Sequence, residues 1–204
     1  LGLERTWAVF EYLTREEKRG HKLTIKAITT DFWDTIAFYP FNEEIFNERV
    51  GHAYGIFRKY DITHDTAKML MRSIYEHFEH IWHNHKRTPT TPEMFKYIEN
   101  IIGYSFDKND FTELVECNEK LIPEKYFTVP EDVVESLRAL SSRFRIIIIS
   151  DTGFEPGREI RNALERSGLL NLFHYGVFSD ETGYSKPDER AFRLAAEKAG
   201  CVPE

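Results

Sequence analysis

The clearest structural signal in the chain is the run Phe144-Arg145-Ile146-Ile147-Ile148-Ile149, which Ser150-Asp151-Thr152-Gly153 follows at once. Four isoleucines in a row lack the alternation of apolar and polar residues that a half-buried strand has. Both faces of this strand are therefore expected to be buried, as in the middle of a parallel sheet that helices cover on both sides. The run predicts an α/β fold in which one strand ends in polar residues.

Working outward from this strand, the pattern alternates between helices and strands. A helix opens at Pro130-Glu131-Asp132, another extends from Pro156 to Ser167, and a short strand is expected from Tyr175 to Phe178. A last helix follows Gly183-Tyr184-Ser185-Lys186-Pro187-Asp188, and an earlier strand is expected from about Leu23 to Asp31. This order predicts a doubly wound, Rossmann-like parallel sheet.

Between the first strand and the rest of the sheet lies a long block with helical spacing of its apolar residues. Helices are expected after Asn42, from near Asp65, from Thr91-Pro92-Glu93 with Thr91 supplying a capping hydroxyl, and from Asp107 to Leu121. We therefore predict three parts, namely an N-terminal helix at 1–21, a discontinuous core at 22–39 and 129–204, and an all-helical cap at 40–128.

The composition limits the classes of function. The chain has 204 residues, of which 41% are hydrophobic and 30% charged, as in globular proteins, and its net charge of -7 does not favour nucleic acid. No apolar run could span a membrane, the charged first twenty residues do not form a signal peptide, and Cys117 and Cys201 lie far apart. We expect a cytoplasmic protein with a small-molecule substrate and neither a nucleic-acid nor a membrane partner, and the sequence does not indicate its oligomeric state.

Three polar residues are placed where chemistry occurs in open α/β sheets, at or just beyond the carboxyl ends of strands. These residues are Asp31, Ser150 and Lys186. An aspartate there can be a nucleophile that forms an acyl-phosphate or an ester, which water later opens. A serine hydroxyl can hold an oxygen of the transferred group, and a lysine can neutralise charge on the aspartate and the substrate.

From about Leu23 to Glu204 the chain resembles the haloacid dehalogenase superfamily. The residues that carry the resemblance are Asp31-Phe32-Trp33-Asp34-Thr35, Ser150 and Lys186-Pro187-Asp188, with the helical block matching the cap of many members. The resemblance implies a hydrolase in which Asp31 is the covalent nucleophile, Ser150 binds the transferred group and Lys186 stabilises charge. It also implies Mg²⁺ bound by Asp31 and the backbone carbonyl of Trp33. The residues predicted to contact the substrate are Trp33, Thr35, Asp151 and Thr152.

Two departures from the family pattern bear on the reaction. Most phosphatases of the family have an acid two residues after the nucleophile, which protonates the leaving group; Trp33 stands there instead, and Asp34 is a possible substitute. An aromatic at that position is found in the family's dehalogenases, which also need a cap arginine. Arg49, Arg58 and Arg72 are available, although all three could face solvent.

The second departure is the missing fourth motif, a glycine–aspartate pair followed by another acid, which is expected after Pro203 and would complete the metal site. Because the chain starts at Leu1 without methionine and stops just after a helix, we expect a fragment that is itself not a competent magnesium enzyme. The primary hypothesis is Mg²⁺-dependent hydrolysis of a small phosphate ester through an aspartyl-phosphate. The alternatives are a 2-haloacid dehalogenase-type reaction and a non-catalytic binding protein.

Overall fold

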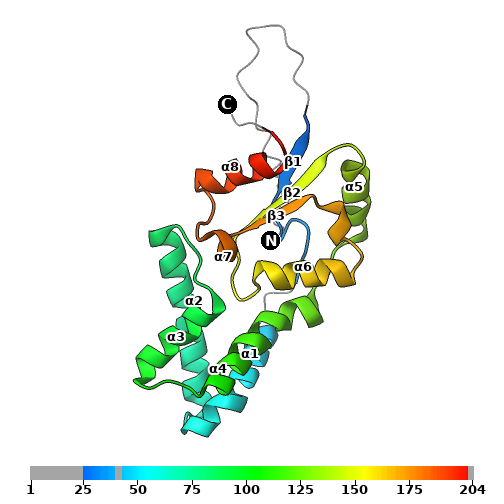
Figure 1. The fold of residues 1–204 in the computed structure, drawn as a ribbon. Helices are drawn as coiled ribbons and strands as arrows, with labels where there is room; N and C mark the ends of the chain where they lie inside the picture. The colour runs from blue at the N-terminus through cyan, green and yellow to red at the C-terminus, as the bar shows by residue number, and fades with distance from the viewer. Residues whose placement is uncertain (1–24, 40–42, 202–204) are drawn as a thin grey trace, which may run out of the picture.

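A computed structural model describes residues 25–39 and 43–201 of the chain (Figure 1). The helix predicted at 1–21, together with Leu23, Asn42 and residues 202–204, lies outside the described residues. Within them the order is one strand, a helical block, and then alternating helices and strands. This is the α/β arrangement that the sequence predicts.

The sheet consists of β1 (Ala27–Thr30), β2 (Arg145–Ser150) and β3 (Tyr175–Phe178) in the order β1-β2-β3. Both pairings are parallel, with Thr30 opposite Ile148 and Ser150 opposite Phe178. The parallel sheet is confirmed, although β1 is shorter than predicted and Asp31 comes directly after its last residue. The carboxyl ends of the three strands therefore meet at one edge.

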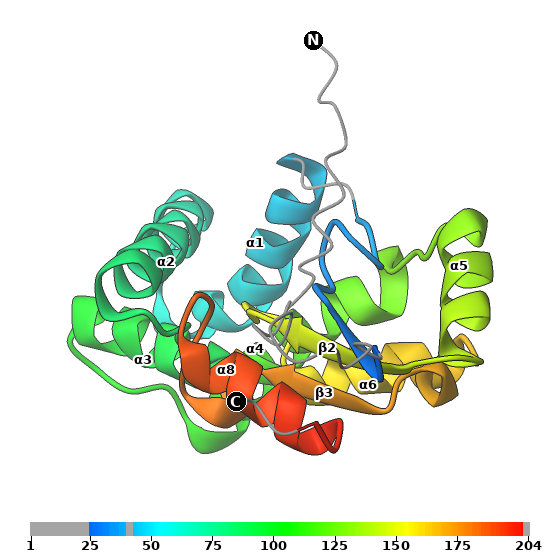
Figure 2. The same ribbon diagram turned by 90° about the horizontal axis from the view of Figure 1, so that it is seen from above.

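The four isoleucines of β2 divide between the two faces of the sheet. Ile146 and Ile148 pack with α5 (Glu131–Ser141) and α6 (Gly157–Arg166). Ile147 and Ile149 pack with Ala191 and Ala195 of α8 (Glu189–Lys198) on the opposite face. Figures 1 and 2 show α8 on one side of the sheet and the other two helices on the other, which explains why β2 needs apolar residues at successive positions.

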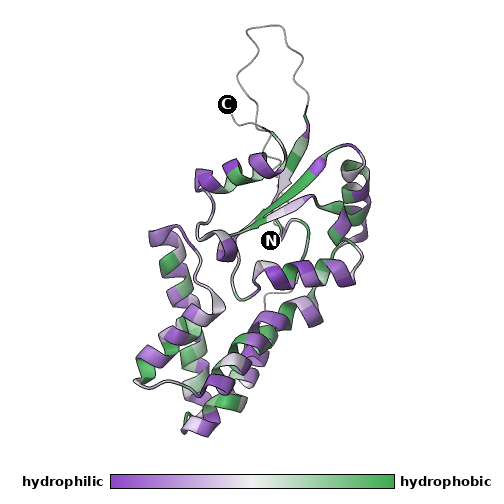
Figure 3. Ribbon diagram, viewed as in Figure 1, coloured by the Kyte–Doolittle hydropathy of each residue, from purple (hydrophilic) through white to green (hydrophobic). Residues whose placement is uncertain are grey.

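The helical block contains α1 (Glu43–Phe57), α2 (His64–His85), α3 (Thr91–Ile102) and α4 (Lys108–Leu121). These helices enclose a separate apolar core, and in Figure 3 each carries hydrophobic and hydrophilic residues in alternation. Figure 1 shows the block beside the end of the sheet toward which the strands point. The two connections to the block are joined by paired backbone bonds between Phe38 and Thr128, at 2.9 and 3.3 Å.

Local details differ from the sequence predictions at several helix ends. The hydroxyl that caps α3 belongs to Thr90 and not to Thr91, because Thr90 and Glu93 form a reciprocal capping box. Thr91 is the first helical residue instead, and its side chain is 2% exposed. Four short helical segments were not predicted: Arg58–Tyr60, Ile122–Tyr126, Leu170–Leu172 and α7 (Ser179–Thr182).

Candidate functional site

The structure brings Asp31 and Lys186 together at the carboxyl edge of the sheet. Lys186 Nζ lies 2.7 Å from Asp31 Oδ1, and the same ammonium donates to the carbonyl of Ile149 at 3.3 Å. The amide of Phe32 also donates to Asp31 Oδ1, at 2.7 Å. The Asp31 side chain nevertheless remains 45% exposed, so the carboxylate is both held and accessible.

Ser150 stands at the same edge, two residues past the partner of Thr30 in the strand register. Its side chain is almost fully buried, and its hydroxyl donates to the carbonyl of Asp151 at 3.2 Å. No hydrogen bond joins Ser150 to Asp31 or Lys186 in the described part of the chain. The structure thus places Asp31 and Ser150 at neighbouring strand ends and brings Lys186 to the same edge from the loop before α8, but it pairs only Asp31 and Lys186 directly.

Trp33 follows Asp31 in a tight turn and packs against other aromatic rings. Its ring centroid lies 4.9 Å from that of Phe32 and 5.2 Å from that of Tyr39, both edge-on. The amides of Ile36 and Ala37 donate to the carbonyl of Phe32, while the amide of Asp34 donates to the carbonyl of Ala37. The Trp33 ring therefore packs among apolar side chains, and its own carbonyl accepts none of the backbone bonds of this turn.

Asp34, the residue considered as a substitute acid, has a left-handed backbone with φ of 58° and an exposed side chain. Aspartate tolerates this conformation better than most residues, because its short polar side chain can bond locally. The turn gives the side chains of Trp33 and Asp34 different exposure to solvent. Asp34 is accessible to solvent, whereas Trp33 is partly covered.

The residues present supply two oxygen atoms of the kind that Mg²⁺ prefers. These are the exposed carboxylate of Asp31 and the carbonyl of Trp33, which accepts no hydrogen bond from the residues that the structure describes. Among residues 25–39 and 43–201, no cluster of three histidine, cysteine or acidic side chains could hold a metal. Because Mg²⁺ usually keeps several waters and uses one or two carboxylates, the pair fits as part of such a site.

Asp151 has a structural position that its sequence context does not reveal. Its Oδ1 accepts from the backbone amide of Lys186 at 2.9 Å, and its Oδ2 accepts from the indole Nε1 of Trp82 at 3.2 Å. Burial raises the pKa of this carboxyl, and the bond from the Lys186 amide opposes that rise. Trp82, near the carboxyl end of α2, thereby reaches the carboxyl edge of the sheet.

Two other residues predicted to bind substrate are less well placed. Thr152 is 1% exposed, and its hydroxyl bonds Ser179 Oγ at 3.0 Å and accepts from the amide of Asp180 at 3.1 Å. Its side chain is therefore committed to the protein interior, so an approach of substrate to this hydroxyl is not supported. Thr35 is partly exposed in the turn after Asp31, where its amide lies 3.4 Å from the carbonyl of Phe32.

Arg49, for which the sequence left a solvent-facing position open, is buried. It is 2% exposed, and its guanidinium forms an ion pair with the buried Glu155 and donates to the carbonyl of Asn118 at 2.7 Å. The guanidinium also lies over the ring of Phe154, 4.3 Å from its centroid. Arg58 is exposed, as expected, and donates to the carbonyl of Gly55. Arg72 is likewise exposed and bonds Glu43 at 3.3 Å.

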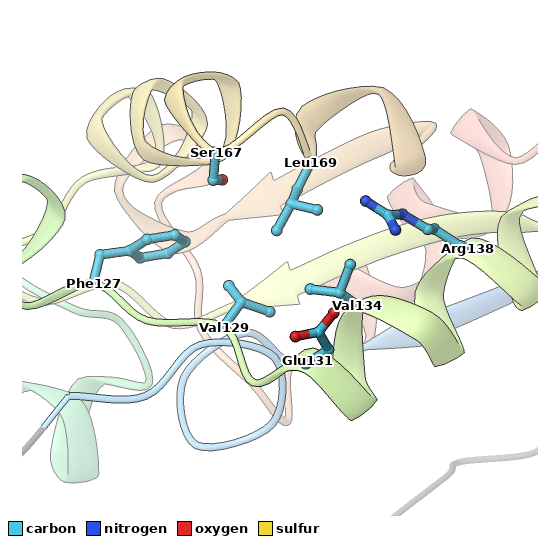
Figure 4. Close-up of a pocket in the computed structure, with 7 residues that line it drawn as sticks. All are labelled: Phe127, Val129, Glu131, Val134, Arg138, Ser167 and Leu169. Carbon is cyan, nitrogen blue, oxygen red and sulfur yellow. The ribbon is translucent and has the colours of Figure 1, made fainter.

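A hollow of about 410 Å³ lies between α5 and the end of α6 (Figure 4). Figure 4 shows Phe127, Val129, Val134 and Leu169 around it, with the polar groups of Glu131, Arg138 and Ser167. None of the predicted catalytic residues lines this hollow. The hollow and the Asp31–Lys186 site are therefore formed by different residues.

Comparisons with known proteins bear on the family and the fold of the chain. Residues 25–204 match the family described as haloacid dehalogenase-like hydrolase. A segment of 67 residues is 39% identical to pyrimidine 5'-nucleotidase YjjG of Escherichia coli strain K12, and covers 33% of this chain and 28% of that protein. The chain thus spans little more than a quarter of the length of this curated relative.

Two solved structures share the fold. The HAD phosphatase from Thermococcus onnurineus has a TM-score of 0.56 at 21% identity, over 86% of this chain and 72% of that chain. A haloacid dehalogenase-like family hydrolase from Xanthomonas campestris has a TM-score of 0.50 at 15% identity, over 87% and 69%. At such identities the likeness concerns the arrangement of helices and strands.

Proposed function

Because the chain belongs to the haloacid dehalogenase-like hydrolases, we propose that it hydrolyses a small phosphate ester through Asp31. The observation that carries the proposal is the exposed Asp31 carboxylate held 2.7 Å from Lys186 Nζ at the carboxyl edge of the sheet. A carboxylate that is fixed but accessible is suited to nucleophilic attack, and an adjacent ammonium can neutralise the charge on the phosphate.

In the proposed reaction, an oxygen of Asp31 attacks phosphorus while the bond from phosphorus to the leaving oxygen breaks. The leaving oxygen departs as an anion that takes a proton from Asp34 or from solvent, and water then cleaves the aspartyl-phosphate to give inorganic phosphate, a proton and the free carboxylate. Lys186 stabilises the negative charge in both steps, and Ser150 at the neighbouring strand end holds one phosphate oxygen. Asp31 and the Trp33 carbonyl would hold Mg²⁺, which would supply further neutralisation of the phosphate charge.

Trp33 determines which esters the site can cleave. Its ring packs against Phe32 and Tyr39, and its indole N–H is too weak an acid to serve as a general acid. General acid catalysis is typically worth about 10²- to 10⁴-fold in rate. Asp34 is exposed in the same turn and is the nearest substitute along the chain. We therefore propose that esters with good leaving groups react well and that alkyl phosphates depend on Asp34.

The test is a substrate series on the full-length protein with Mg²⁺. We expect turnover of p-nitrophenyl phosphate, rates roughly 10²- to 10⁴-fold lower for alkyl phosphates, and loss of turnover with EDTA. Nucleoside 5'-phosphates belong in the series because the curated relative is a pyrimidine 5'-nucleotidase. Binding of phosphate analogues without turnover of any ester would refute the phosphatase proposal and favour a non-catalytic binding protein.

The dehalogenase-type reaction is the second candidate, because Trp33 supplies the aromatic residue that this branch has. Arg49 argues against it, since its guanidinium is already paired with Glu155 and with a backbone carbonyl. Release of halide from a 2-haloacid without any metal would favour this candidate over the phosphatase. We place the reaction in the cytoplasm, consistent with the free cysteines Cys117 and Cys201. None of the described helices is long and apolar enough to cross a membrane.

A further inference from the structure

The carboxyl end of α2 is joined to the loops that carry the catalytic residues. Trp82 Nε1 donates to Asp151 Oδ2 at 3.2 Å, and the amide of Ser185 donates to the carbonyl of Lys86 at 3.1 Å. Thr88, just beyond the helix, bonds Ser179 through their hydroxyls, and both side chains are buried. The carboxyl end of α2 and the residues just after it thus contact the segments after β2, after β3 and before α8.

Asp151 is the residue through which this contact can reach the reaction. One of its oxygens accepts from Trp82 in the helical block, and the other accepts from the backbone amide of Lys186. The Lys186 side chain then extends to Asp31 at 2.7 Å. A single carboxylate therefore links a helix of the block to the cation beside the nucleophile.

The same contacts bear on whether Asp151 could itself supply a proton. Both of its oxygens accept hydrogen bonds from N–H groups, an arrangement that the ionised carboxylate satisfies. Protonation would remove the negative charge from the acceptor and so weaken both of these bonds. Asp151 is therefore placed to hold other groups and not to act as the missing general acid.

We propose that Trp82 and Asp151 form a latch, in which the seating of the helical block on the sheet sets the position of Lys186 at Asp31. The inference rests on the proposed function, because Lys186 matters only if Asp31 performs the chemistry. Asp151 and Trp82 are positioning residues, since neither contacts Asp31. The latch makes the ammonium fully effective only while α2 is seated.

Conservative substitutions can remove the Trp82–Asp151 hydrogen bond while leaving most of the surrounding packing in place. Trp82→Phe keeps an aromatic ring beside Phe78, whose centroid lies 6.1 Å from that of Trp82, but removes the N–H donor. Asp151→Asn keeps an acceptor for the Lys186 amide but presents an NH₂ group that cannot accept from Trp82. A matched control is Tyr104→Phe, which removes a donor to the carbonyl of Tyr60 (3.1 Å) on the exposed side of the helical block.

The experiment combines two measurements on the full-length protein and its variants. Hydrogen exchange of the amide of Lys186 reports the latch without any catalysis. Steady-state kinetics on p-nitrophenyl phosphate report its effect on Lys186. For Trp82→Phe we expect faster exchange at Lys186 and kcat about tenfold lower with KM within twofold, because the lost bond involves a charged acceptor.

Asp151→Asn should behave in the same way, and the double variant should be no worse than either single one, since both changes remove one link. Tyr104→Phe should leave exchange and kcat unchanged. Unchanged exchange at Lys186 in Trp82→Phe, or additive losses in the double variant, would overturn the latch.

The two levels of the proposal fail separately. If Asp31→Asn retains turnover, the proposed function is wrong, while the exchange measurement still decides whether the latch exists. If Asp31→Asn is inactive but Trp82→Phe has the kcat and Lys186 exchange of the wild type, only the latch is refuted.

Discussion

The ion pairs Asp31–Lys186 and Arg49–Glu155 each join a residue before or within α1 to a residue after β2, and they differ in the burial of their side chains. Asp31 and Lys186 meet at the carboxyl edge of the sheet with side chains that are 45% and 26% exposed. Arg49 of α1 and Glu155, in the loop after β2, meet inside the protein with side chains that are 3% and 6% exposed. The first pair leaves a carboxylate accessible to substrate, whereas the second leaves nothing accessible.

The difference in burial implies a difference in role. Exposed ion pairs contribute little to stability, whereas removal of one partner from a buried pair leaves an uncompensated charge. Burial raises the pKa of the Glu155 carboxyl and Arg49 opposes that rise, so each partner needs the other. We conclude that Arg49–Glu155 holds the helical block on the sheet and that Asp31–Lys186 is available for chemistry.

The largest expected effect is on the exposed pair and concerns activity. Asp31→Asn should lower turnover of p-nitrophenyl phosphate by more than about 10⁴-fold, because the nucleophile is lost. Its free energy of unfolding should change by less than about 1 kcal/mol. Kinetics and urea unfolding of the same sample test both statements, and a strongly destabilised Asp31→Asn would contradict the contrast between the pairs.

The next effect is on the buried pair and concerns stability. Arg49→Met should lower the free energy of unfolding by about 3–5 kcal/mol, because Glu155 would remain buried without its partner. The double variant Arg49→Met with Glu155→Leu should recover most of that loss. Urea unfolding is the measurement, with Arg72→Met as the exposed control, whose pair with Glu43 should matter by less than about 1 kcal/mol. A loss below about 1 kcal/mol for Arg49→Met would mean that the buried pair contributes no more to stability than an exposed pair, which would contradict the contrast.

A third pair sharpens the comparison, because its two partners differ in burial. Glu119 of α4 is 2% exposed and pairs with Arg158 of α6, whose side chain is 57% exposed. Burial raises the pKa of Glu119 to about 7, although Arg158 opposes the rise. The carboxyl therefore holds a proton in the folded protein under conditions in which the unfolded chain has lost it.

The sign of the pH dependence follows from this shift. The usual pKa of a glutamate is 4.5, and that of Glu119 in the folded protein is about 7. Between these two pH values unfolding releases a proton, so the contribution of Glu119 to stability falls as pH rises. Glu119→Gln should remove this fall and gain on the order of 2 kcal/mol relative to wild type between pH 5 and pH 8. Urea unfolding at both pH values tests it, with the exposed Glu116→Gln as control. A constant difference between Glu119→Gln and wild type would refute the shift.

The sequence was sufficient for the features that depend on local pattern. The four isoleucines of β2 predicted a strand buried on both faces, and the strand Tyr175–Phe178 was predicted with its observed bounds. The order Asp31, Ser150, Lys186 on successive elements placed three candidates at one edge. The carboxyl ends of neighbouring parallel strands meet at one edge, which places Asp31 and Ser150 there, and the loop before α8 brings Lys186 to the same edge.

Features that depend on pairing across the fold could not be predicted. Arg49 lies on the buried face of α1 between Ile45 and Ala53, and its partner Glu155 comes from a distant loop that no local pattern indicates. The Thr152 hydroxyl turns inward because Ser179 follows the neighbouring strand, and Trp82 reaches Asp151 because of how α2 ends. In each case the deciding partner lies on another element, where periodicity carries no information.

The identity of the nucleophile is tested most directly by acid quenching the full-length protein during turnover of p-nitrophenyl phosphate, followed by mass spectrometry of its peptides. The account predicts a phosphoryl group on the peptide that contains Asp31, and its absence in Asp31→Asn. A phosphoryl group on any other side chain, or an unmodified Asp31 in samples in which phosphate forms at the wild-type rate, would contradict it.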